Sequence, residues 1–364
     1  MIKIPFGFSS KNSLGIDIGT FSIKIVELLK KGERKVLENY GEVLTRQIGD
    51  RPFRTGFIPE SSTFLLSTRE ISQGIQAIFN EAKFRFRSAT FSIPDFSSFF
   101  TTIELPPMTK EELPKAINFE ARQHIPLPLS EVVLDWSVIS EEARESRDSP
   151  LKVILVAVPK EVINQYQEIS RVCNIKLLAL EAEVFGLART LIKGDKKIII
   201  LVDIGAQSTT VSIVEDKILK RSYSFDIAGN NLTQALSQSL NVNFWEAEEL
   251  KKKYGITQKS NNAIHQKPIS QILLPRINLI LTEIEKISQN FYQEENKEVD
   301  SIVLAGGTAL LPGLKEYFAS QLKKEVIIGD PFSNIFYPQI LTPVLKETGP
   351  SYAITVGMAL RGLE

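Results

Sequence analysis

The chain of 364 residues has a single cysteine, Cys173, and only two histidines, His124 and His265. One cysteine excludes an internal disulfide, and its place between Ile169 and Ile175 predicts a small core residue rather than a nucleophile. The two histidines lie far apart in the sequence, with no cysteine or second histidine beside either. A zinc site or a Ser-His-Asp triad is therefore not expected.

Net charge and long apolar runs are missing as well. Lys and Arg number 43, as do Asp and Glu, and the isoelectric point is about 6.8. This balance does not indicate binding to nucleic acid or to an anionic membrane surface. No window approaches the roughly 18 apolar residues of a membrane span, and residues 1–13 are too short and too broken by Pro5 and Gly7 for a secretory signal. We expect a cytoplasmic protein, in agreement with its cysteine content.

One sequence pattern occurs twice in the chain. Residues 13–28 read SLGIDIGTFSIKIVEL and residues 198–214 read IIILVDIGAQSTTVSIV, each a strand, an Asp-x-Gly turn and a second strand. The aspartates of the two turns, Asp17 and Asp203, are 203 − 17 = 186 residues apart. At 364 residues two or more domains are expected, so the repeat predicts two related halves that hold one ligand between them.

The residues of the two turns favour a nucleotide as that ligand. Glycine lets backbone N–H groups approach phosphates closely, and aspartates reach Mg²⁺ through water, here Asp17 and Asp203. A single Asp-x-Gly turn is weak evidence because both residues form turns anyway, and a lysine such as Lys24 can also lie on an exposed strand face. The candidate phosphate-binding residues are Gly19, Thr20, Phe21, Ser22 and Lys24 in the first turn and Gly205, Ala206, Gln207, Ser208 and Thr209 in the second.

Later segments supply candidates for the nucleoside end. Two glycines follow an apolar strand and precede a helix, so bare backbone can lie against a planar ring. A glutamate three residues before a lysine on a predicted helix can hold ribose hydroxyls, although alone it would be an ordinary surface ion pair. The common phosphate motifs GxxxxGK[ST] and GxGxxG are absent. The candidates are Gly229, Glu248, Lys251, Gly306, Gly307 and Thr308.

The order of these segments resembles that of the actin-like ATPases, which include actin, MreB, FtsA, DnaK-type chaperones and sugar kinases. The segments are DIGTFSIK, Glu181 followed by Leu187 and Ala188, DIGAQST, AEELK and AGGT. Within this superfamily the chain is similar to the PilM family of type IV pilus assembly proteins. Three passages carry this narrower similarity: FEARQHIPLPLSEVVLDWSVI at 119–139, FDIAGNNLTQAL at 225–236 and the closing SYAITVGMALRGLE.

The resemblance implies an α/β fold with duplicated ribonuclease H-like domains around an ATP cleft and an inserted α+β subdomain, 1C. Asp17 and Asp203 are then expected at the magnesium ion, and Glu181 near the attacking water as the catalytic residue. Phe21 and Gln207 depart from the stricter family pattern, so nucleotide binding with slow ATP hydrolysis at most is expected. The implied boundaries are 13–88 for the first part of subdomain 1A, 89–176 for 1C, 177–197 and 340–364 for the remainder of 1A, and 198–339 for domain 2 (2A and 2B).

The family also implies the function and the partners. We expect a cytoplasmic ATP-binding scaffold that docks the N-terminal cytoplasmic tail of the membrane protein PilN between 1A and 1C, links it to the pilus motor ATPases, and is recruited to the inner face of the membrane by these partners. Self-association is a further expectation. Phe91, Phe96, Phe99 and Phe100 either line the tail groove or pack the core of 1C.

Two alternatives stay open at this stage. An FtsA-like cell-division filament or tether would need a basic amphipathic membrane segment, which the sequence does not show. A small-molecule kinase would need an acid or base beside an acceptor pocket, and the inserted segment offers no convincing candidate.

Overall fold

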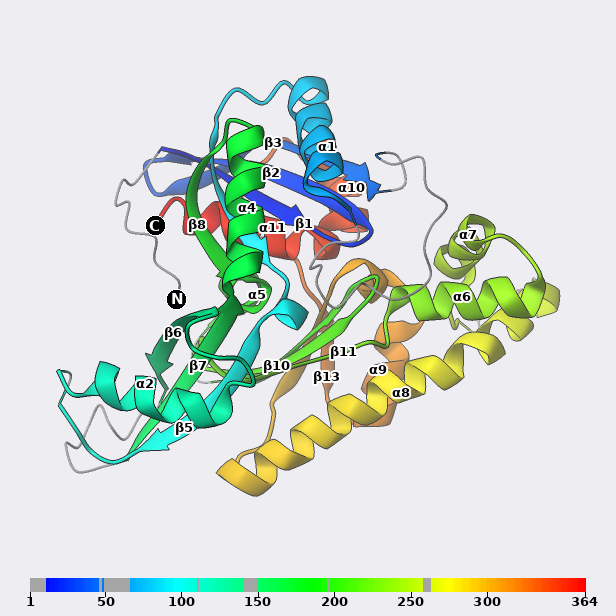
Figure 1. Ribbon diagram of the computed structural model, residues 1–364. Coiled ribbons are helices and arrows are strands. Elements are labelled where there is room, and N and C mark those ends of the chain that lie inside the picture. The colour runs from blue at the N-terminus through cyan, green and yellow to red at the C-terminus, as the bar shows by residue number, and fades with distance from the viewer. Residues whose placement is uncertain are drawn as a thin grey trace.

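The computed structural model describes residues 11–45, 48, 66–109, 111–139, 150–194, 197–257 and 263–364, with the backbone alone for 263–267. Three β-sheets organise these residues, two of five strands and one of three. Figure 1 shows the first five-stranded sheet at the top, the second below it, and the small sheet at the lower left. We call the parts built on the two larger sheets the first and second lobes.

The two larger sheets share one topology. In each, three consecutive antiparallel strands are followed by two strands parallel to the first of them. The prediction of two related halves is therefore confirmed. The first sheet has the order β3 (Arg34–Leu44), β2 (Ser22–Lys31), β1 (Asn12–Ile18), β4 (Ser88–Ile93), β8 (Lys176–Ala182). The second has the order β11 (Ile218–Phe225), β10 (Thr209–Glu215), β9 (Ile198–Ile204), β12 (Ser301–Ala305), β13 (Glu325–Ile328).

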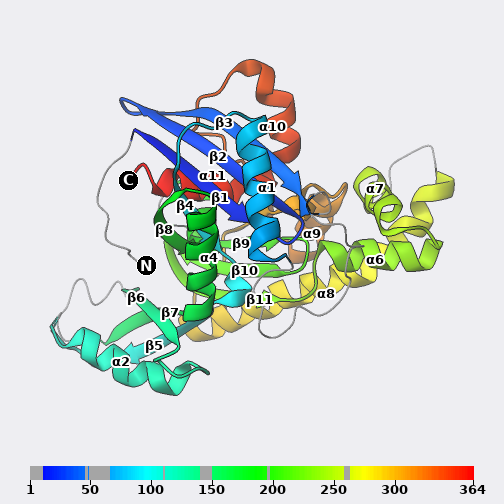
Figure 2. The same ribbon diagram turned by 45° about the horizontal axis from the view of Figure 1, so that its top comes forward.

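Helices cover both faces of the first sheet. The amphipathic helices α1 (Thr68–Glu81) and α4 (Lys160–Val172) lie on one face, and α11 (Ala353–Arg361) lies on the other, where it packs against α5 (Glu183–Leu191) (Figures 1 and 2). Cys173 is buried at the end of α4, as expected for a core cysteine. Because both faces are covered, β1 is buried along nearly its whole length.

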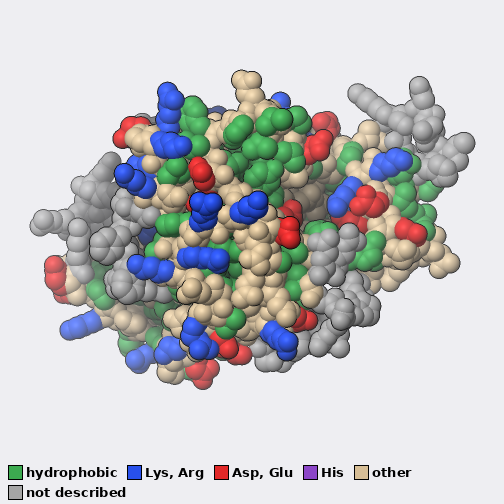
Figure 3. Space-filling model, turned by 90° about the horizontal axis from the view of Figure 1, so that it is seen from above, with side chains coloured by type: hydrophobic (Ala, Val, Ile, Leu, Met, Phe, Trp, Pro, Cys, Tyr) green, Lys and Arg blue, Asp and Glu red, His purple; other side chains and the backbone are tan. Residues whose placement is uncertain are grey.

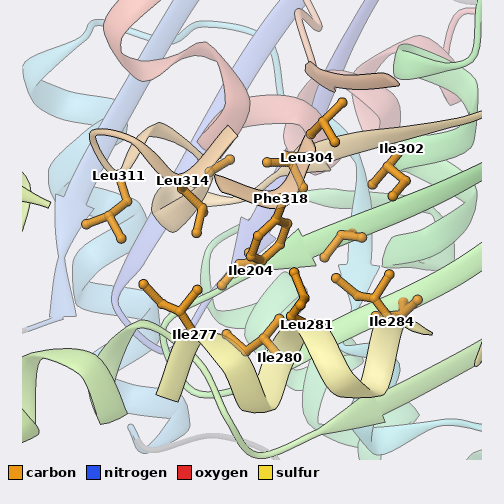
Figure 4. Close-up of a cluster of buried hydrophobic side chains, with 14 of the residues drawn as sticks. Ile204, Ile277, Ile280, Leu281, Ile284, Ile302, Leu304, Leu311, Leu314 and Phe318 are labelled. Carbon is orange, nitrogen blue, oxygen red and sulfur yellow. The ribbon is translucent and has the colours of Figure 1, made fainter. Parts of the chain in front are cut away.

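The second lobe has its own core under a long helix. The helices of this lobe are α6 (Gly229–Leu240), α7 (Phe244–Tyr254), α8 (Ala263–Glu295) and α9 (Leu314–Leu322). In Figure 4, Ile277, Leu281 and Ile284 of α8 point toward Phe318 of α9 and Leu304 of β12. The helical spacing of apolar residues along α8 therefore reflects core packing.

The small sheet is inserted between β4 and α4. Its order is β5 (Phe99–Leu105), β7 (Leu151–Pro159), β6 (Val132–Val138), and α2 (Leu113–His124) packs on it. The sequence put the start of this insertion at residue 89, but β4 pairs with both β1 and β8 in the first sheet. The reason is that β4 is a buried central strand, with Phe91 in the core of the first lobe against Tyr166 of α4. The inserted sheet begins at Phe99 and ends at Pro159.

The remaining short helices connect these parts. They are η2 (Asp95–Ser97), η3 (Gly307–Leu310), η4 (Gln339–Leu341), α10 (Thr342–Thr348) and η5 (Gly349–Tyr352). Among the residues described, no helix is both long enough and apolar enough to cross a membrane.

Apolar side chains gather next to basic ones on the face of the first lobe seen from above (Figure 3). Phe336, Ile340 and Val344 are exposed by 52%, 85% and 37%, so three exposed large apolar residues fall within nine positions. Phe336 bridges to Val36 of the edge strand β3, and the guanidinium of Arg34 lies 4.9 Å from the centre of its ring. The patch therefore lies at the edge of the first sheet, and exposed apolar clusters of this kind often mark contact surfaces.

Close packing of α11 on β1 makes Gly15 essential for stability. A Cβ at this position would lie 2.0 Å from the carbonyl oxygen of Thr355 and 2.5 Å from the amide nitrogen of Ala359, both backbone atoms that cannot move aside. We expect Gly15→Ala to lower the free energy of unfolding by about 2 kcal/mol or more. Urea unfolding measures this, with Gly349→Ala as the control because its Cβ would make only ordinary contacts at 3.7 Å. Equal midpoints for the two variants would contradict the packing described.

Candidate nucleotide site

The two hairpin turns have the same geometry. The amide of Gly19 donates to the carbonyl of Ser22 at 3.1 Å, and the amide of Gly205 donates to the carbonyl of Ser208 at 3.1 Å. A Cβ at either glycine would lie 3.0 Å from that same carbonyl oxygen. Glycine therefore keeps each turn tight and leaves its other amides uncovered.

A cavity of about 590 Å³ lies between the lobes and is lined by both turns. Its volume falls within the usual range for small-molecule sites. The structure brings nearly all the predicted site residues to this cavity. They are Asp17, Gly19, Thr20, Phe21, Ser22, Lys24, Asp203, Gly205, Ala206, Gln207, Ser208, Gly229, Glu248, Lys251, Gly306, Gly307 and Thr308.

Thr209 and Glu181 do not line the cavity. Thr209 begins β10, and its buried hydroxyl donates to the carbonyl of Ile227 at 2.6 Å. The carboxylate of Glu181 accepts two hydrogen bonds from Arg189, at 2.6 and 2.9 Å, and lies 3.8 Å from Arg361. Glu181 is thus the buried partner of two arginines in the first lobe.

Glu181 lies away from the cavity because β8 is longer than the sequence indicates. The sequence indicates a helix beginning at Glu181, but the strand continues to Ala182 and the helix α5 starts at Glu183. The carboxylate that lines the cavity is that of Glu183, which sequence reasoning missed. Both carboxylates stand in the run Glu181-Ala182-Glu183, and the change from strand to helix after Ala182 sends their side chains to different places.

The two turn aspartates are held in a poorly solvated place. Asp17 is 5% exposed and accepts a hydrogen bond from the Ser92 hydroxyl at 2.7 Å. Burial raises the pKa of Asp17, whereas the nearby Lys24 ammonium lowers it. Burial, with the charge of Asp17 as a further cause, raises the pKa of Asp203 to about 7, and Lys24 again opposes the shift. Such sites gain from a bound cation, since it stabilises both ionised carboxylates.

Behind these aspartates lies a second acidic pair, Asp95 and Glu183, which sequence reasoning also missed. The amide of Asp95 donates to Glu183 Oε2 at 3.2 Å, and the amide of Val184 donates to Asp95 Oδ1 at 3.3 Å. Burial raises the pKa of Asp95 to about 8, and the charge of Asp203 adds to this. Burial and the charges of Asp95, Asp17 and Asp203 raise the pKa of Glu183 well above its ordinary value.

A buried ion pair occupies the second-lobe side. Lys251 Nζ lies 2.7 Å from Glu248 Oε2, and both residues are 5% exposed, so this is not the surface ion pair considered from the sequence. Lys251 also donates to the Gly229 carbonyl at 3.1 Å, and Thr233 donates to Glu248 at 2.5 Å. The charges and hydrogen bonds of Lys251 hold the pKa of Glu248 below its usual range, against the opposing effect of burial. Glu248 is therefore a fixed, ionised acceptor at the cavity wall.

The double glycine has two different roles. Gly306 has φ +83°, and a Cβ there would lie 2.5 Å from Asp203 Oδ1, so only glycine suits this position. At Gly307 a Cβ would have no atom within 4 Å, and the residue lines the cavity. The open backbone at Gly307 therefore offers a surface that a flat ring can approach.

Phe21, the unusual residue of the first turn, reaches across to the second lobe. Its ring centre lies 6.0 Å from that of Trp245 and 5.6 Å from Lys252 Nζ, both on α7. Phe21 and Lys252 line the cavity, so this contact joins the lobes beside it.

The donors suit a hydrated divalent cation and a phosphate chain. Gln207 Oε1 is buried and has no hydrogen-bond partner among the described residues, so it is free to accept from a water molecule. In the described part of the chain, no three His, Cys, Asp or Glu side chains converge to bind a metal directly. Mg²⁺ keeps most of its waters and needs only one or two carboxylates, and the two turn aspartates, Asp17 and Asp203, match that number.

The raised pKa of Asp95 predicts a pH-dependent stability. Folding lifts this pKa from 3.8 to about 8, so the folded chain retains a proton that the unfolded chain releases. The free energy of unfolding should fall as pH rises through this window, by up to about 1.4 kcal/mol per pH unit for one proton. Asp95→Asn has no such proton, so its slope should be shallower, although Asp203 and Glu183 still contribute in the same direction. Urea unfolding from pH 5 to 8 measures the slopes, with exposed Asp226→Asn as the control. Identical slopes for wild type and Asp95→Asn would contradict this assignment.

Comparison with solved structures supports the fold. The chain aligns with the structure described as a PilM-PilN type IV pilus biogenesis complex over 98% of its own length and 100% of the other chain, with 23% identity and a TM-score of 0.81. It aligns with the ethanolamine utilization protein EutJ from Carboxydothermus hydrogenoformans over 97% of its own length and 90% of the other chain, with 16% identity and a TM-score of 0.57. It aligns with MreB 5 of Spiroplasma citri bound to AMPPNP over 97% of its own length and 96% of the other chain, with 12% identity and a TM-score of 0.55. These likenesses show the actin-like ATPase fold, as predicted.

Curated relatives are more distant. The cell division protein FtsA of Staphylococcus epidermidis is 23% identical over 195 residues, which cover 49% of this chain and 42% of that protein. FtsA of Pseudomonas aeruginosa is 22% identical over 233 residues, 58% of this chain and 54% of that protein. The chain thus spans about half the length of the curated relatives it matches.

A model of one family, described as type IV pilus assembly protein PilM, matches residues 15–363, which is nearly the whole chain. The paired turns, the two repeated sheets and the inserted subdomain agree with this match. The chain belongs to the PilM family of type IV pilus assembly proteins.

Proposed function

We propose that the protein is an ATP-binding scaffold of type IV pilus assembly, in which nucleotide in the interlobe cavity biases docking of the N-terminal tail of a PilN-like membrane protein. The observation that carries the proposal is the pair of matched glycine turns facing one cavity from two lobes. The similarity to a chain of a PilM-PilN complex supports the choice of partner.

The two turns hold the phosphates in this proposal. Backbone amides of both turns and the hydroxyls of Thr20 and Ser208 supply donors, and all of these residues line the cavity. Lys24 is positioned by its bond to the Ser22 hydroxyl at 2.6 Å and by Glu42 at 3.4 Å, so its charge stays at the cavity. Mg²⁺, when bound, neutralises phosphate charge, and Asp17 and Asp203 hold it through water.

The second lobe holds the nucleoside. Glu248, fixed by Lys251 and Thr233, accepts hydrogen bonds from ribose hydroxyls, and the open backbone at Gly307 faces the base. Adenine is preferred here on the family resemblance rather than on a base-specific contact.

Slow turnover fits the same geometry. A general base must be ionised to accept a proton from water. Burial and three neighbouring carboxyl groups raise the pKa of Glu183 well above its ordinary value, which opposes the action of this cavity carboxyl as a general base. The site therefore suits retention of ATP better than rapid hydrolysis.

The inserted subdomain is placed to sense both lobes. Thr102 of β5 donates to the Lys220 carbonyl at 3.4 Å, and Lys220 Nζ donates to the Ile139 carbonyl at 2.8 Å. Lys152 of β7 pairs with Glu295 at the end of α8 at 2.8 Å. A change in the angle between the lobes would therefore alter the contacts of the inserted subdomain, beside which the tail docks in this proposal.

The metal assignment predicts the behaviour of Asp203→Ala. Because Asp203 holds Mg²⁺ through water, its loss should weaken Mg·ATP binding by about 10- to 100-fold or more. The fold should persist, since the change removes a buried carboxyl whose charged form is disfavoured. Isothermal titration calorimetry measures the affinity, with exposed Asp226→Ala as the control. A wild-type affinity of Asp203→Ala for Mg·ATP would contradict the assignment of Asp203 to the magnesium site.

The scaffold proposal also predicts coupling between nucleotide and tail. A synthetic peptide of the N-terminal cytoplasmic tail of the PilN-like protein should bind with affinities that differ by about fivefold or more with and without Mg·ATP. A ligand shifts a conformational equilibrium only through different affinities for its two states. Fluorescence anisotropy of the labelled peptide measures both affinities, and a scrambled peptide is the control. Equal affinities would refute the coupling and leave nucleotide binding unaffected.

A further inference from the structure

The chain enters the inserted subdomain directly behind the nucleotide cavity. Strand β4 ends at Ile93, η2 spans Asp95–Ser97, and β5 begins at Phe99. Pro94 and Phe96 line the cavity on either side of Asp95. This short connection is thus the structural link between the cavity and the small sheet on that side.

Asp95 joins this connection to the start of α5 by two hydrogen bonds, one that it donates to Glu183 and one that it accepts from Val184. Its amide donates to Glu183 Oε2, and its own Oδ1 accepts from the amide of Val184, at 3.2 and 3.3 Å. Val184 lies in the first turn of α5, whose N-cap residue Ala182 has no side-chain hydrogen bond to offer. Asp95 therefore caps α5 while Glu183 caps η2, so two hydrogen bonds join the starts of these segments.

Asp95 is otherwise isolated. It is 2% exposed, and its Oδ2 has no hydrogen-bond partner among the described residues. A buried carboxyl with an unpaired oxygen costs stability that an apolar residue would not.

The same link touches the second lobe. The turn η2 contacts β11, and β5 contacts β11 as well. Glu183 lines the cavity with Asp17 and Asp203, and both aspartates influence its pKa. Glu183 therefore stands between the cavity and η2, because it lines the cavity and accepts the hydrogen bond of the Asp95 amide.

We propose that Asp95 is a positioning residue that couples the nucleotide cavity to the inserted subdomain, through its reciprocal hydrogen bonds with Glu183 and the start of α5. This inference rests on the proposed function, because it assigns the route by which nucleotide biases docking of the tail. The route runs from Glu183 to the backbone of Asp95, then along η2 into β5.

The test is the ratio of tail-peptide affinities with and without Mg·ATP in matched variants. In Asp95→Ala the cap on Val184 is lost, so the ratio should fall to within about twofold of one, whereas Mg·ATP affinity alone should stay within about threefold of wild type. Asp95→Asn keeps the Oδ1 acceptor and should restore at least about half of the wild-type ratio. Ser97→Ala removes a hydroxyl bond to the Pro94 carbonyl in the same turn without touching Glu183, and it should leave the ratio unchanged.

Three outcomes decide the matter. A wild-type ratio in Asp95→Ala overturns this inference and leaves the scaffold proposal standing. A ratio of one in the wild type overturns both. Equal loss in Asp95→Asn and Asp95→Ala also overturns it, because a general packing defect would then explain the loss.

A measurement on the wild type keeps the inference testable if Asp95→Ala does not fold. Mg·ATP should change amide hydrogen exchange in residues 95–105, since these amides lie on the route, while α9 on the far side of the second-lobe core should be unaffected. Unchanged exchange in 95–105 on saturation with Mg·ATP overturns the inference.

Discussion

The structure depends on holding two aspartates from two lobes at one poorly solvated place. Burial raises the pKa of both aspartates, the charge of Asp17 adds to the shift at Asp203, and Lys24 opposes the shift at both. Without a further positive charge, such a cluster disfavours the ionised state and with it the closest approach of the lobes. A metal ion bound between them reverses the sign of that interaction. In the proposed function, this electrostatic interaction links the angle between the lobes to the occupancy of the cavity.

The second acidic pair extends this link away from the cavity. Two hydrogen bonds join Asp95 to Glu183 and Val184, and they cap the starts of η2 and α5. The inserted sheet follows directly from η2 and contacts the second lobe through Thr102 and Lys220. A small subdomain with contacts to both lobes is well placed to convert their relative position into a change at its own surface.

Much of the fold and most of the site could be predicted from the sequence. The repeated turns were recognisable because glycine and aspartate follow buried strands in both, and the same chemistry recurs at the same structural position. The double glycine was recognisable because Gly306 needs a positive φ beside Asp203, where another residue would collide. The helix α8 was recognisable from its apolar period, and it continues through Pro268 and Pro275.

Two of the failures share one cause, which is that tertiary contacts decide where a strand ends. Glu181 and Glu183 differ by two positions, and only the pairing of β8 with β4 extends the strand to Ala182 and moves the helix start. The same pairing keeps residues 89–93 in the first sheet, where the sequence alone suggested a new subdomain. Asp95 gave no local signal, because a lone aspartate after a proline is typical of a turn, and its partners lie 88 and 89 residues away.

The central claim is tested most directly by a crystal structure of the protein with Mg²⁺ and a non-hydrolysable ATP analogue. The account predicts phosphates in contact with both the 19–22 and 205–208 turns and a metal between Asp17 and Asp203, and it would be contradicted by an analogue bound to one turn alone or outside the cavity.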